Sequence, residues 1–253
     1  MPGRPGLERL PQRTGRAVGS CDCQVCDVVG GTMDEARWAR YAALGGIWFV
    51  VLNVIGTFLA GAPPKTTDSA VKIAKYFHDH HRGLEVGTFL LGLGLIGLFW
   101  WFGSLWRIMV DAEGGSARMA VVAAIGLGVA APMALMSGVI TSTIALQFGA
   151  LSAITVKFFY IMSLVALAAA GFGIVTHIAA VTSLSYRTRM FAQWVNVIGW
   201  LAALLFLIST IGVVTDRNWV GLLGLLSFLV WCLWIVVVSV NLLQRRTETA
   251  GAT

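Results

Sequence analysis

Apolar residues dominate six long stretches of the chain, and polar residues gather between them. The stretches cover residues 41–62, 84–106, 119–146, 156–181, 194–215 and 219–243. Each is long enough to cross a bilayer as an α-helix, which takes about 20 apolar residues. Hydrocarbon offers backbone amides no water, so runs of this length predict helices, and the alternation typical of a barrel is absent. The pattern predicts an all-α, polytopic bundle of about six membrane-spanning helices within residues 37–245.

The composition agrees with a chain that is solvated by lipid. Of its 253 residues, 57% are hydrophobic and 12% are charged, whereas a soluble domain has roughly 25% charged residues. The net charge is +6. Its basic residues stand beside the apolar runs, where they predict orientation and contact with anionic lipid. We expect the lipid bilayer and another membrane protein as partners, no nucleic acid, and a multi-pass location in the plasma membrane.

The basic residues also predict which way the helices cross. The connection 182–193 holds two arginines and no acid, and Arg245 and Arg246 follow the last stretch. The loop 147–155 has no charge, and the four cations of the first long loop are accompanied by acids. Positive charge on short loops favours the cytoplasm. Both termini are therefore predicted to be cytoplasmic, with residues 246–253 as a short tail.

The first 36 residues differ from the rest of the chain. They hold three prolines and four arginines without apolar periodicity, which predicts a disordered leader. Met33 stands directly before a charged segment that precedes the first apolar stretch, so we hypothesise that translation starts there. Cys21, Cys23 and Cys26 have a metal-like spacing, but no fourth ligand stands near them in sequence, so no zinc site is predicted.

The longest external connection, residues 63–83, has features of its own. Asp68 is suited to cap a short helix from Ser69 to His80, with Val71, Ala74 and His78 on one stripe. We expect that helix to lie along the membrane surface, separate from the next crossing. Within that crossing, a ladder of glycines predicts close helix packing: Gly87, Gly92, Gly94 and Gly97.

Few polar side chains fall inside the apolar stretches. Asn53 is central in the first stretch, and His177 lies near the inner end of the fourth. Ser137, Thr141 and Gln147 make the outer half of the third stretch polar, so that these five residues are candidates for lining a cavity. The alternative is that hydroxyls and amides bond the backbone of their own helices and that His177 makes a hydrogen bond between helices.

Metal binding and catalysis have weak support in this sequence. His78 and His81 are three residues apart and are the best candidates for metal ligands, although no distant partner is evident and a solvated helix end explains them equally. No catalytic constellation, P-loop or dinucleotide fingerprint is present, so no catalytic residue and no cofactor is predicted. No Asp, Glu, Lys or Arg occurs in residues 86–106, 119–156, 158–186, 190–215 and 218–244. Proton-coupled carriers usually keep a carboxylate there.

Two segments resemble a known group of proteins. The pattern Asp68-Ser69-Ala70-x-x-Ile73-Ala74-x-Tyr76-Phe77-x-Asp79-His80, together with the segment from Arg189 through Trp194 to Gly199, resembles small actinobacterial membrane proteins that contain a domain of unknown function. The likeness covers residues 37–245. It implies a six-helix bundle, and it implies no activity, cofactor or catalytic residue.

Three functions are compatible with these patterns. The leading hypothesis is a non-enzymatic accessory or structural membrane component, because the bundle lacks ions and has short loops. The alternative is a transporter or channel for a small or lipid-like molecule, using the polar residues of the first, third and fourth stretches. A membrane-embedded redox or cofactor-binding subunit is a third possibility, for which His177 would need a second axial ligand.

Overall fold

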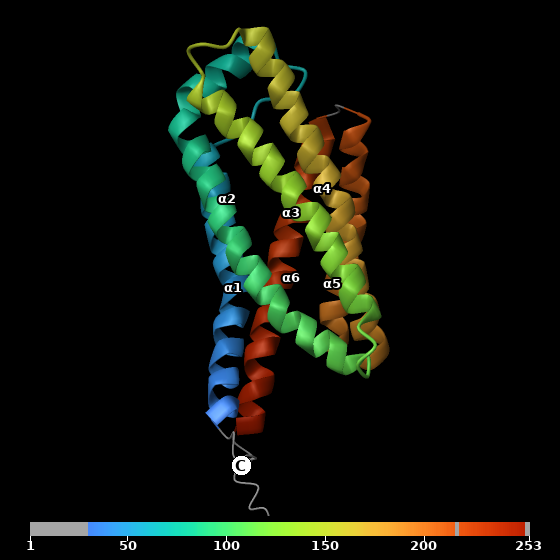
Figure 1. Cartoon of the computed structure of the whole chain (residues 1–253). Helices are drawn as coiled ribbons and strands as arrows, with labels where there is room; N and C mark the ends of the chain where they lie inside the picture. Colours follow the sequence, from blue (N-terminus) through green and yellow to red (C-terminus); the bar gives the residue numbers. More distant parts are fainter. Residues whose placement is uncertain (1–29, 216–217, 251–253) are drawn as a thin grey trace, which may run out of the picture.

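The described part of the chain folds into helices without strands, as predicted. The computed structural model describes residues 30–215 and 218–250, with the side chains of residues 41, 43–215 and 219–244 (Figure 1). Its elements in chain order are α1 (Gly30–Ala60), α2 (Ala70–Ala112), α3 (Arg118–Leu146), α4 (Ala153–Thr188), α5 (Gln193–Ser209), the 3-10 helix η1 (Thr210–Val213) and α6 (Asn218–Ala250).

Within this part of the chain, six helices are long and apolar enough to cross a membrane. The prediction of a polytopic bundle is thereby confirmed. The first helix begins at Gly30 and so includes the last residues of the segment 1–36 that was predicted to be disordered. The three clustered cysteines lie outside the described residues. The start of translation at Met33 and the cytoplasmic side of the bundle remain predictions.

The helices form a closed ring. Each packs against its neighbour in the chain, α6 returns to α1, and α2 also contacts α4. The described start of α1 and end of α6 lie together at one end of the bundle (Figure 1), here called the termini end. The connections 61–69 and 147–152 lie at the opposite end, here called the cap end.

Glycines set the closest helix contacts. On α1 and α2, Gly45 faces the carbonyl of Gly97, and a Cβ on Gly56 would lie 3.2 Å from the carbonyl oxygen of Gly87. Such contacts between backbones replace the hydrophobic effect as the source of helix association in lipid. The predicted ladder is confirmed for Gly87, Gly94 and Gly97, whereas nothing lies within 4 Å of a Cβ on Gly92.

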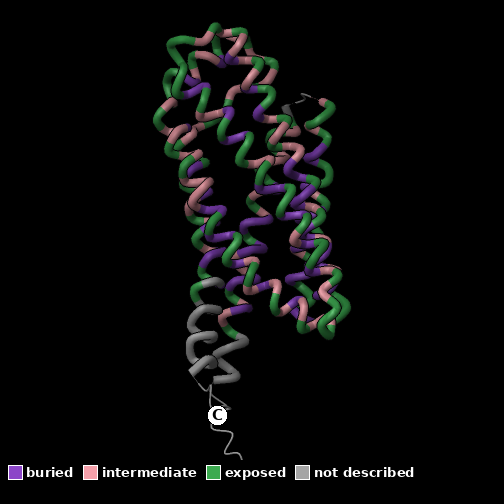
Figure 2. Tube along the Cα trace, viewed as in Figure 1, coloured by how far each residue is buried: buried purple, intermediate pink, exposed green. Residues whose placement is uncertain are grey.

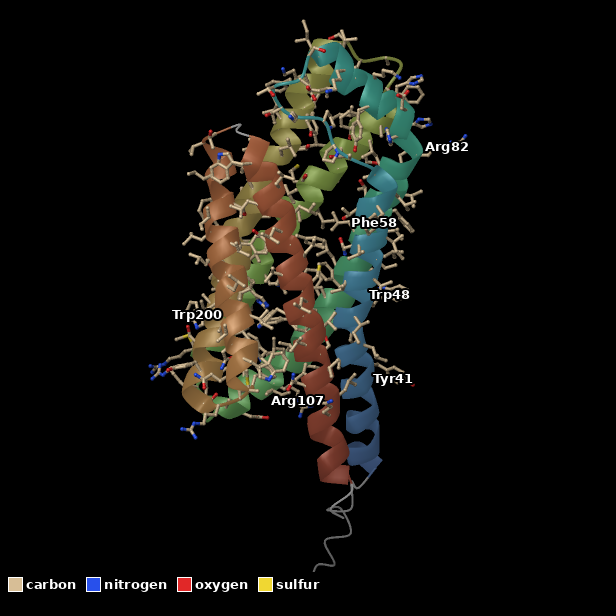
Figure 3. All side chains as sticks on the ribbon, turned by 180° about the vertical axis from the view of Figure 1, so that it is seen from behind. Tyr41, Trp48, Phe58, Arg82, Arg107 and Trp200 are labelled. Atoms are coloured by element: carbon tan, nitrogen blue, oxygen red, sulfur yellow. The ribbon has the colours of Figure 1, made fainter. Side chains whose placement is uncertain are left out.

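Many large apolar side chains lie exposed on the outer surface of the bundle. Figure 2 shows buried positions along the inner faces of the helices and exposed positions along their outer faces. Figure 3 labels Tyr41, Trp48 and Phe58 down the outer face of α1, and Phe58 is 82% exposed. Exposed side chains of this kind are stable against lipid tails, so this surface is the lipid-facing side of an integral membrane protein.

The predicted surface helix is part of a membrane-spanning one, which corrects the prediction. α2 runs unbroken for 43 residues from Ala70, about 65 Å at 1.5 Å per residue. Its first turns bury Ile73 and Phe77 against the end of α3 and the start of α4, which contribute Ile144 and Tyr160. This apolar stripe continues into the stripe of the crossing itself, so nothing ends the helix in between.

The start of α2 also differs in detail from the prediction. Ser69, not Asp68, is the N-cap, because its hydroxyl accepts a hydrogen bond from the backbone N–H of Lys72 at 3.3 Å. Val71 is exposed rather than on the packed stripe. The carboxylate of Asp68 instead accepts from the N–H of Lys65 at 2.9 Å and pairs with the ammonium of Lys72 at 3.0 Å.

Candidate functional site

His177 is the most deeply buried ionisable group among the described residues. It has no exposed surface, and its Nδ1 lies 3.0 Å from the carbonyl oxygen of Ala123 on α3. A carbonyl only accepts, so Nδ1 is the donor and the neutral ring carries its lone pair on Nε2. The rings of Phe102, Trp101 and Trp234 surround the imidazole, with centroids at 5.2, 6.3 and 6.4 Å.

Among all the residues that the structure describes, four side-chain polar atoms are buried without a hydrogen-bond partner. They are Trp101 Nε1, His177 Nε2, Thr182 Oγ1 and Trp231 Nε1. An unpaired buried polar group costs about 1–3 kcal/mol, so packing alone does not account for them. The lone pair on His177 is of the type that binds iron or another metal. Across the described residues, however, no three His, Cys, Asp or Glu side chains gather as a metal site.

The other predicted cavity residues are dispersed. Asn53 is buried and donates to the carbonyl of Phe49, one turn earlier on α1, at 2.9 Å. Ser137 is buried on α3 and Thr141 is half-buried, whereas Gln147 is exposed at the C-cap of α3. None of these residues, nor His177, lines the hollow between α1 and α2 at Gly45 and Gly97 or the one beside Pro64 and Asp68. A transport path through them stays a prediction.

The two candidate metal ligands of the cap end contact the same aromatic ring. His78 and His81 lie against Phe148, with ring centroids 5.1 and 4.6 Å away. The Nδ1 of His81 lies 2.8 Å from the carbonyl oxygen of His78, and the Nδ1 of His78 lies 3.2 Å from Asp79. Both histidines thus help to pack the connection 147–152, and metal binding by them stays a prediction.

Three donors that the sequence reasoning missed fasten the connection 61–69. The hydroxyl of Tyr76 donates to the carbonyl of Ala60, and that of Tyr160 donates to the carbonyl of Pro64, both at 2.7 Å. The ammonium of Lys157 donates to the carbonyl of Asp68 at 2.8 Å. Their partners are carbonyls many residues away, and no spacing within the sequence indicates such pairs.

A carboxylate at the termini end organises the start of α3. Glu113 accepts hydrogen bonds from the backbone N–H groups of Met119 and Ala120 at 3.1 and 3.0 Å, and from the hydroxyl of Ser116 at 3.1 Å. Desolvation acts to raise the pKa of this carboxyl, but these donors outweigh it and hold the pKa below its ordinary value of 4.5. The anion thus stabilises the helix N-terminus.

We expect the start of α3 in Glu113→Gln to be as weakly held at neutral pH as it is in the native chain in acid. A lowered folded-state pKa means that the carboxylate's stabilisation is present above pH 4.5 and is lost as the pH falls through the folded pKa. In Glu113→Gln at pH 7, the amides of Met119 and Ala120 should exchange hydrogen about two- to fivefold faster than in the native chain.

The control for this prediction is a nearby acid whose side chain does not accept these bonds. Asp111→Asn removes one negative charge from the same end and should leave exchange at Met119 and Ala120 unchanged. Native protein and Glu113→Gln should converge as the pH falls below the folded-state pKa of Glu113. Equal exchange of the two at pH 7 would show that the carboxylate does not hold the start of α3.

The fold defines the class: this chain is a multi-pass integral membrane protein with a six-helix bundle. Comparisons with protein-family models, with curated proteins and with solved structures find no match. Its function therefore has to be argued from the geometry of the bundle itself.

Proposed function

We propose that this protein is a non-enzymatic accessory or structural component of a membrane complex. The observation that carries the proposal is how the interior is filled. Trp101, Trp234 and Phe49 are buried at the centre of the bundle, and the helices that enclose them touch at glycines. A bundle packed in this way has a rigid outer surface that suits binding to another membrane protein.

The polar groups of the interior support the same function. Several buried hydroxyls, unlike that of Thr182, bond carbonyls three or four residues earlier on their own helices, as in Ser163, Ser227 and Ser239. Such groups are satisfied without water or solute. Among the described residues no Asp, Glu, Lys or Arg is buried, and proton-coupled carriers usually keep a carboxylate within the membrane.

A transporter for small or lipid-like molecules is the second candidate. The observation that favours it is a pair of unpartnered polar atoms, His177 Nε2 and Trp101 Nε1, on rings whose centroids lie 6.3 Å apart. A solute or water that passes through the bundle would find an acceptor on His177 Nε2 and a donor on Trp101 Nε1. A transporter would move solute or lipid as a purified protein without a partner, whereas an accessory component would not.

Reconstitution into liposomes distinguishes them. We expect release of trapped calcein, and exchange of fluorescent phospholipid between leaflets, at rates within about twofold of empty liposomes, because the core is filled. In native membranes the protein should migrate as a discrete larger complex with one stoichiometric membrane protein. Flux well above that of empty liposomes that falls in Asn53→Ala and His177→Ala would contradict the proposal and favour the transporter.

A further inference from the structure

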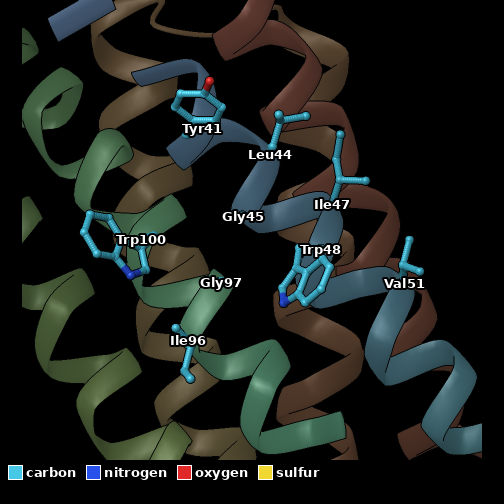
Figure 4. A pocket seen from close by; sticks show the side chains of 9 residues that line it. All are labelled: Tyr41, Leu44, Gly45, Ile47, Trp48, Val51, Ile96, Gly97 and Trp100. Atoms are coloured by element: carbon cyan, nitrogen blue, oxygen red, sulfur yellow. The ribbon is translucent and has the colours of Figure 1, made fainter. Parts of the chain in front are cut away.

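A groove runs along the lipid-facing surface between α1 and α2. Its volume is about 530 Å³, which is within the range of small-molecule pockets. Figure 4 shows its lining, with Gly45 and Gly97 between Trp48 and Trp100. The two glycines bring the helix backbones into contact, so the larger side chains on each side stand up as walls. The indole Nε1 of Trp48 donates to the carbonyl of Leu93 at 3.3 Å, which holds one wall in place.

The chemistry of the lining selects an apolar occupant. Apart from the indoles and the hydroxyl of Tyr41, the groove is lined by Leu44, Ile47, Val51, Ile96 and backbone. The walls include side chains that are more than half exposed, such as Ile96 at 56%. The groove therefore opens sideways into the hydrocarbon and offers van der Waals contact to a hydrocarbon chain.

The length of the groove matches one leaflet. Its α1 wall extends from Tyr41 to Val51, ten residues or about 15 Å along a helix. The hydrocarbon core of a bilayer is about 30 Å thick, so each leaflet contributes about half of that. The wall begins near the termini end and finishes near the middle of the crossing Ala43–Ala60.

A basic residue stands where the headgroup of such a lipid would be. Arg107 follows Trp100 by seven residues on α2, which places both on the same side of the helix. The guanidinium of Arg107 is exposed at the termini end, and Figure 3 labels it there. Arginine is suited to bind a phosphate.

We propose that the groove between α1 and α2 retains one anionic phospholipid, with an acyl chain between Trp48 and Trp100 and its phosphate at Arg107. This site is independent of the proposed partner function. The bound lipid fills a hollow that the glycine contacts leave in the surface. It also joins the two helices on the side that faces the bilayer.

The test uses the full chain in nanodiscs with photoactivatable phospholipids that carry a diazirine in the acyl chain. An anionic phosphatidylglycerol probe should label peptides containing residues 41–51 and 96–100 about fivefold more than a phosphatidylcholine probe, the factor expected of one arginine contact. Arg107→Gln should make the two probes equal. Ile96→Trp and Leu44→Trp fill the groove and should abolish labelling of these peptides by both probes.

Ile125→Trp is the matched control, because Ile125 is exposed on α3, outside the groove. It should leave labelling of the groove unchanged, and each variant is first checked for an unchanged unfolding temperature. Labelling that is equal for both probes and insensitive to Ile96→Trp would mean ordinary contact with bulk lipid and would overturn the proposal. An unlabelled groove accompanied by a crosslinked pair of chains would overturn it as well, since a second copy would then occupy the site.

Discussion

Gly126→Leu should prevent α3 from packing on α4 and leave little folded protein. A Cβ at this position would lie 2.6 Å from the backbone nitrogen of His177 and 2.7 Å from the carbonyl oxygen of Gly173. Both neighbours are backbone atoms of a helix, which cannot move aside as a flexible side chain does. Overpacking in a core costs typically 1–3 kcal/mol, and here whole helices must separate, so we expect a loss of more than about 3 kcal/mol. The yield of monodisperse protein in detergent and its unfolding temperature measure the effect.

The chain contains its own control for this experiment. Gly128 is two residues further along α3, and nothing lies within 4 Å of a Cβ at that position. Gly128→Leu should therefore fold with nearly native yield, and leucine should even favour the helix slightly. If both variants were recovered equally well, α3 and α4 would not meet at Gly126 and Gly173.

These two glycines also show how far the sequence predicts the fold. The apolar runs predict that six helices exist, because bilayer thickness alone sets their minimum length. They do not predict which face of a helix meets a neighbour, since both lipid and protein core accept apolar residues. Gly92 and Gly94 are equally eligible for close packing by sequence, yet only Gly94 faces α1, where it meets Asn53 and Phe49.

The ends of the helices were harder to predict than their middles. Charges in the segment from Lys72 to Arg82 mark it as wetted, and that segment was expected to lie flat. Its buried residues, Ile73 and Phe77, instead pack on the end of α3 and the start of α4, at Ile144 and Tyr160. A helix continues through such a polar region when other helices cover it, and the apolar pattern does not predict that contact.

The sequence predicts that His177 is a candidate site residue, but it does not predict which side chains surround it. His177 stands out because an ionisable residue within a membrane stretch is unusual, and its bond to Ala123 is the hydrogen bond between helices that the alternative to a cavity role predicts. The aromatic residues around it come from α2 and α6. Tryptophans are common at membrane interfaces, so their sequence positions gave no signal that two of them meet a histidine in the core.

Trp101→Ala should destabilise the bundle strongly and do so through the loss of contacts. Trp101 is fully buried, and its ring lies 6.3 Å from that of His177 and 6.2 Å from that of Trp234. Replacing a buried tryptophan by alanine costs about 3–5 kcal/mol in soluble cores, part of it from the cavity left behind. In lipid the transfer part is smaller, but the cavity part persists because the helices cannot close around it. We expect about 2–4 kcal/mol, measured as a fall in unfolding temperature in detergent.

A second tryptophan variant is the control, because it removes an indole that is not buried in the core. Trp200 on α5 is 46% exposed, and Figure 3 shows its place on the outer surface. Lipid or detergent replaces its contacts, so Trp200→Ala should lower the unfolding temperature little. Trp101→Phe keeps a ring beside His177 and should fall between the native chain and Trp101→Ala. If Trp101→Phe were as unstable as Trp101→Ala, the unpartnered indole Nε1 would have a partner in the membrane. The core around His177 would then contain bound water or solute, as the transporter hypothesis requires.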